Sequence, residues 1–131
     1  MPFVGPDDIL LYMDGTVFIS DGGGRGQAQS LFKVTTEGGA PTPFVAPETV
    51  GTPNMFNPYG MAISPPTFTG HNVNPGDLIV ADNGFAREIH KAVWAINPST
   101  GAARPIAKGS VFVDGPLSVG FGPDAGRLTC T

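Results

Sequence analysis

Five side chains that carry oxygen atoms flank the apolar runs of this chain, and their types suit a metal ion. Asp21 and Asp82 each close a run of alternating apolar residues, and Asn83 directly follows the second. Asn57 and Asp114 precede two other runs. Calcium prefers about six to eight oxygen ligands, so these residues form a candidate calcium site. In the structural interpretation, Asp21 and Asp82 instead accept backbone N–H groups and hold their own loops.

Acid–base chemistry has few candidates in this sequence. His90 lies in the segment FAREIHK close to Glu88, and a histidine beside a carboxylate can act as a general base near neutral pH. A solvent-facing loop histidine is the plainer interpretation of the same residue. His71 belongs to another loop, which we expect on the opposite face. Ser118 lacks the setting of a nucleophile elbow, which excludes a Ser-His-Asp hydrolase.

A repeat of about 60 residues must position these side chains. The segments DGTVFISDGGG and GDLIVADNG share a turn, an alternating apolar run and an Asp. Two further strands follow in the same order in each unit, 31–34 with 93–96 and 41–47 with 103–109. PYGMAIS likewise matches PLSVGFG. The pattern predicts four-stranded units over about 7–47 and 58–109, and two strands of a third unit over 116–131.

Antiparallel four-stranded units at this period are typical of β-propeller blades. We therefore predict an all-β chain that forms a single β-propeller-like domain over residues 1–131, incomplete as a ring. Such units must bury their flat faces, and three arrangements would do so. The chain assembles with copies of itself as a homo-oligomer, it is a fragment of a longer propeller, or it forms an incomplete sandwich of two sheets.

Composition excludes several classes of partner. The formal charge is −4 without a basic stripe, which argues against nucleic acid. No apolar run is long enough to cross a bilayer, so we expect no membrane association. The single cysteine, Cys130, excludes an internal disulfide. The first residues show no secretory signal, and the cellular location stays open.

Two groups of segments resemble a known superfamily. GDLIVADNG followed by VWAINPSTGA resembles the NHL-type six-bladed propellers, and PYGMAIS and DGPLSVGFGPDAGRL are similar to hairpins of its regucalcin–gluconolactonase group. The resemblance covers roughly residues 8–131. It implies, for the lactonase members, a divalent ion at the mouth of the central channel, often calcium. Tyr59 and Leu117 depart from that pattern, because they stand where the family carries Asn or Asp before the innermost strands.

The resemblance and the acidic residues lead to one functional hypothesis and one alternative. The first is a small calcium-dependent hydrolase of lactonase type, in which the metal polarises the carbonyl of a lactone or ester and activates water. His90 or Glu88 would be the base, and the metal ligands would come from Asp21, Asp82, Asn83, Asp114 and Asn57. The alternative is a non-catalytic propeller module for protein binding or oligomer assembly. Tyr59 and Leu117 favour the alternative, as do the edge strands expected at both ends.

Overall fold

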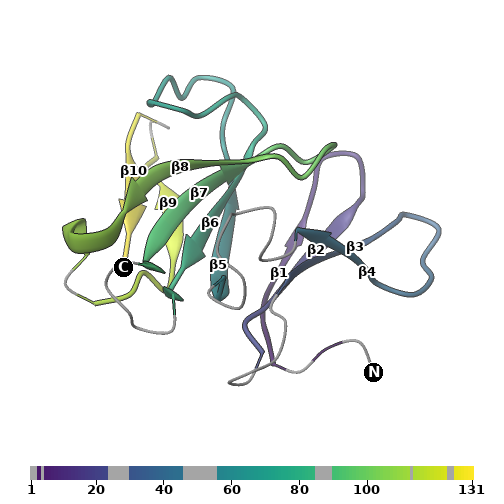
Figure 1. Ribbon diagram of the computed structural model, residues 1–131. Coiled ribbons are helices and arrows are strands. Elements are labelled where there is room, and N and C mark those ends of the chain that lie inside the picture. Colours follow the sequence, from purple (N-terminus) through teal and green to yellow (C-terminus); the bar gives the residue numbers. More distant parts are fainter. Residues whose placement is uncertain are drawn as a thin grey trace.

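The computed structural model describes residues 3, 5–23, 30–45, 56–84, 90–112, 114–123 and 126–131. Within these residues the chain forms three antiparallel sheets, which lie next to one another in chain order (Figure 1). The first sheet contains β1 (Pro6–Leu11), β2 (Val17–Asp21), β3 (Ser30–Val34) and β4 (Thr42–Val45). The second contains β5 (Pro58–Ile63), β6 (Leu78–Asp82), β7 (Ala92–Ile96) and β8 (Ala103–Lys108). The third pairs β9 (Val119–Phe121) with β10 (Leu128–Cys130), and the 3-10 helix η3 (Gly109–Val111) follows β8.

The all-β class and the four-stranded antiparallel units are confirmed. Strands follow the chain order β1-β2-β3-β4 and β5-β6-β7-β8, as the duplicated pattern predicts. The described sheets do not close into a ring, so the propeller itself stays a prediction. No helix in the described part of the chain has the length and apolar character needed to cross a membrane.

Local turn chemistry explains why the strands reverse where they do. In the turn between β7 and β8, Asn97 Oδ1 accepts the N–H groups of Ser99 at 2.8 Å and Thr100 at 3.0 Å. Gly101 then adopts φ +76°, a left-handed conformation that costs glycine little. The sequence NPSTGA therefore specifies this turn through its own residues.

Alternating residues of the second sheet face two separate cores. Leu78 and Val80 of β6 point toward the first sheet, where they pack in one cluster with Phe18. Ile79 and Ala81 of the same strand point the other way, into a cluster that includes the third sheet. All five residues of β6 and all five of β7 are buried, because the second sheet is covered on both faces.

The first strand of the second sheet, β5, is hydrogen-bonded both to β1 and to the segment before β9. Met61 N donates to Asp8 Oδ2 at 2.8 Å, which links β5 to β1. Gly60 N donates to the Leu117 carbonyl at 2.9 Å, which links β5 to the segment before β9. A Cβ on Gly60 would lie 2.9 Å from that carbonyl oxygen, so glycine permits this close approach.

Candidate functional site

Asp82 ends β6 and binds three N–H groups that come from different parts of the second unit. Its Oδ1 accepts the backbone N–H groups of Asn57 and Gly84, both at 2.9 Å. Its Oδ2 accepts the indole N–H of Trp94 at 2.9 Å. The carboxylate thus ties the segment before β5, the loop after β6 and the neighbouring strand β7 into one unit.

Asp21 occupies the same position in the first unit, as the strand registers show. Pro6 pairs with Asp21 as Pro58 pairs with Asp82. Asp21 Oδ1 accepts the backbone N–H of Gly5 at 2.8 Å and that of Gly23 at 2.9 Å. The structural interpretation of both aspartates is therefore confirmed, since each carboxylate binds the backbone on either side of its own loop.

The two aspartates differ in their third contact and in their surroundings. Burial raises the pKa of the Asp82 carboxyl to about 6, although hydrogen bonds from Asn57, Trp94 and Gly84 act in the opposite direction. In the first unit Phe32 takes the place of Trp94, and it has no N–H to donate. The repeat therefore keeps the two backbone contacts of the aspartate and varies the side-chain contact.

Asn57 and Asn83 each lie against a glycine of the neighbouring unit. A Cβ on Gly22 would come within 2.5 Å of Asn57 Oδ1, and one on Gly115 would come within 2.0 Å of Asn83 Nδ2. The backbones of the two asparagines also meet, because Asn83 N donates to the Asn57 carbonyl at 3.0 Å. Their side chains therefore fill the junctions between units at the end of the sheets where Asp21 and Asp82 lie.

The remaining predicted site residues have fewer described contacts. Asp114 is exposed in the segment before β9, next to Gly115. His90 is half-buried beside Gly84, since a Cβ on that glycine would lie 2.6 Å from the His90 carbonyl oxygen. Glu88 lies outside the described residues. His71 is exposed in the β5–β6 connection, at the opposite end of the sheet from the β6–β7 loop, as expected.

The donor set fits a calcium ion poorly. Both Asp82 oxygens and Asp21 Oδ1 already accept N–H groups, so a cation would have to replace those contacts. In the part of the chain that the structure describes, no three His, Cys, Asp or Glu side chains gather as a metal site would require. The geometry brings Asp82, Asn83 and Asn57 together, and it uses them to connect backbone segments.

A second group of carboxylates, on β1, was not among the predicted site residues. Asp7 Oδ2 accepts the Gly22 N–H at 3.0 Å, and burial raises the pKa of the Asp7 carboxyl. Asp8 reaches across to Met61 N, as described above. Both residues line a hollow of about 330 Å³ on the outer face of the first sheet, together with Phe3, Pro6, Ile9 and Ile19. The sequence signal was the polar pair in a strand whose counterpart reads Tyr59-Gly60.

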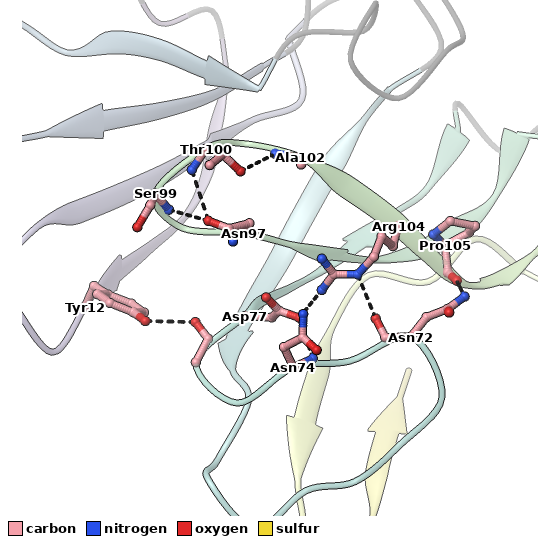
Figure 2. A network of polar contacts seen from close by, with 11 residues as sticks. Tyr12, Asn72, Asn74, Asp77, Asn97, Ser99, Thr100, Ala102, Arg104 and Pro105 are labelled. Carbon is pink, nitrogen blue, oxygen red and sulfur yellow. Dashed lines mark hydrogen bonds and ion pairs between the residues drawn. The ribbon is translucent and has the colours of Figure 1, made fainter.

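The opposite end of the sheets holds a second polar network (Figure 2). Arg104 of β8 forms an ion pair with Asp77 and donates through Nε to the Asn72 carbonyl at 3.1 Å. The Tyr12 hydroxyl donates to the Gly76 carbonyl at 2.9 Å, which joins the first unit to this network. These contacts fasten the long β5–β6 connection to β8 and to the end of β1.

Comparisons with known proteins add no relative to this picture. No protein family, no curated protein and no solved structure matches the chain.

Proposed function

We propose that the chain is a non-catalytic repeat module that assembles with a second copy of itself. The binding surface is the outer face of the first sheet, formed by the residues of β1–β4 that point away from the second sheet. One observation carries this proposal: Ile9 on that face is 69% exposed, whereas Met61, its counterpart in the second unit, is 8% exposed. The strand registers make the two residues equivalent, because Ile9 pairs with Ile19 as Met61 pairs with Val80.

Further apolar residues share this face with Ile9. Leu11, also on β1, is 68% exposed, and Ile9 and Ile19 line the hollow at the other end of the strand. Large exposed apolar patches on soluble proteins mark interaction sites. The two carboxylates at the rim turn toward their own backbone partners, Gly22 and Met61, so they leave the apolar centre accessible.

A second copy is the partner that the repeat itself favours. The equivalent face of the second sheet is covered by the first sheet, through Phe18 and Leu31. The equivalent face of the third sheet is covered by the second, where Val119 packs with Ile79. This chain therefore already contains two surfaces that pack against a face equivalent to the exposed one. A second copy of the chain can supply such a surface to the outer face of the first sheet.

Molar mass in solution tests the proposal. We expect the mass of the wild-type chain, measured by light scattering, to rise with concentration. Ile9→Asp should weaken association at least about tenfold, because it places a charge in an apolar contact. Val111→Asp is the matched control, since Val111 is 68% exposed on η3, away from this face. A monomer at every concentration, or equal effects of the two substitutions, would refute self-assembly through this surface.

The calcium-dependent lactone or ester hydrolase stays a prediction, and a metal titration addresses it. Calcium should leave the melting temperature unchanged if Asp21 and Asp82 serve only as backbone acceptors. A rise in melting temperature with calcium, together with turnover of a lactone, would favour the hydrolase and contradict a non-catalytic module.

A further inference from the structure

Asparagine and glycine occupy complementary positions at the two junctions between units. Asn57 and Gly115 are equivalent, because each directly precedes the proline at which the first strand segment of its unit begins. Gly22 and Asn83 are equivalent as well, because each follows the aspartate that ends the second strand of its unit. Asn57 lies over Gly22 at one junction, and Asn83 lies over Gly115 at the other. Each junction thus combines one asparagine with one glycine. The asparagine stands before the proline at the first junction and after the aspartate at the second.

Gly5 is the third member of the first set, and no described side chain comes within 4 Å of a Cβ placed on it. It precedes Pro6 and donates its N–H to Asp21, as Asn57 donates to Asp82. A Cβ on Gly5 would have a single described atom within 4 Å, Gly23 N at 3.9 Å. Gly5 therefore resembles Gly115 without the asparagine that covers Gly115.

The outer face of the first sheet copies the face that β9–β10 presents to the second sheet. The registers place Ile9 at the position of Val119 and Leu11 at that of Phe121. Val119 and Phe121 pack on the far face of the second sheet, which is formed by Ile79, Ala81, Val93 and Ala95. The first sheet forms this face with four strands, whereas β9–β10 forms the equivalent face with two strands of three residues each.

We infer that the first sheet of one copy competes with β9–β10 of another copy for the far face of the second sheet, and that Asn83 of that copy then lies over Gly5. This inference rests on the proposed self-assembly and identifies the surface that the exposed face binds. The β9–β10 pair acts as a displaceable cap. Because the two contacting faces differ, the assembly is head-to-tail and can continue from copy to copy.

Covalent attachment gives the cap an advantage in this competition. A tethered segment has a high effective concentration, so the uncapped form is rare and wild-type chains associate only when concentrated. Weakening the cap should move association to lower concentration without any change in the exposed face.

The test uses light scattering on the 131-residue chain and its variants. Val119→Asp weakens the packing of the cap and should lower the concentration needed for association about tenfold. Adding Gly5→Asn should reverse that gain, because two asparagines then meet at one junction. Gly38→Asn is the matched control, since it lies in an exposed turn with no described atom within 4 Å of a Cβ, and asparagine tolerates its φ of +79°. Adding Asn83→Gly to the Val119→Asp/Gly5→Asn variant should restore association. The contact between copies then again combines one asparagine, at position 5, with one glycine, at position 83.

The possible outcomes separate this inference from the proposal on which it rests. If Ile9→Asp abolishes association while Gly5→Asn behaves like Gly38→Asn, self-assembly survives and the Asn83–Gly5 contact is refuted. If hydrogen exchange shows β9–β10 released in Val119→Asp and the chain stays monomeric, the cap is refuted. If Val119→Asp does not fold, the single substitution Gly5→Asn in the otherwise wild-type chain decides. At high protein concentration Gly5→Asn should lower the average molar mass, and Gly38→Asn should not.

Discussion

The first and second sheets share one repeat and differ in what covers them. Both begin with a proline paired to an aspartate, and both aspartates bind the backbone before and after their loops. The second sheet lies between two others, and its central strands β6 and β7 are buried on both faces, whereas the first sheet exposes Ile9 and Leu11. The comparison shows that the repeat keeps the two backbone contacts of the aspartate in each unit. The position of the unit in the series decides which faces are covered, and so how much each apolar residue stabilises the fold.

Removing the two aspartates should give the largest difference between the sheets. Asp82→Ala leaves three N–H groups without their acceptor in a buried site, and we expect it to lower the free energy of unfolding by about 3 to 5 kcal/mol. Asp21→Ala should cost about 1 to 2 kcal/mol, because its contacts to Gly5 and Gly23 are only partly buried. Urea unfolding of the two variants measures the difference. Asp114→Ala, at an exposed position, is the control and should change stability by less than about 0.5 kcal/mol. Equal losses for Asp82→Ala and Asp21→Ala would contradict the comparison.

Equivalent apolar residues should give the next largest difference. Met61→Ala empties part of the core between the first two sheets and should cost about 2 to 4 kcal/mol. Ile9→Ala removes a side chain that is mostly exposed in the monomer, so its cost there should stay below about 0.5 kcal/mol. Thermal unfolding of dilute protein tests both. A large loss for Ile9→Ala in the monomer would mean that the outer face is already covered within one chain.

The buried carboxyl of the second unit should make stability depend on pH. The pKa of Asp82 is raised to about 6, above the unfolded value of about 3.9, so the folded state binds this proton more tightly. The contribution is fully present below about pH 4 and is lost as the pH rises through about 6, with a magnitude of about 2 to 3 kcal/mol. Urea unfolding of the wild type and of Asp82→Asn between pH 4 and pH 7 isolates it. Identical pH slopes in the two proteins would show that Asp82 does not titrate differently in the folded state.

Much of the fold could be predicted from short segments. The alternating run before Asp82 and the turn residues Asn97 to Gly101 act on their immediate neighbours, so their signals survive in the sequence. The candidate site was predicted less well. Asp82 lies beside Asn57, whose N–H it accepts. Its contact with Trp94 depends on the pairing of β6 with β7 and on the indole orientation. Asp7 and Asp8 were missed because their acceptor roles depend on Gly22 and Met61, which are distant in sequence.

The sequence by itself determined the strands, their order within each unit and the duplication, because hydrophobic alternation and turn chemistry are local properties. Only the tertiary structure decided which faces are covered, since Ile9 and Met61 are both large apolar residues at the same position in the repeat and only Met61 has a described sheet opposite it. The same holds for Asn83 over Gly115, and for Gly5, where no described side chain comes within 4 Å of a Cβ. Burial and steric fit depend on surfaces brought together from distant parts of the chain, and no single unit carries that information.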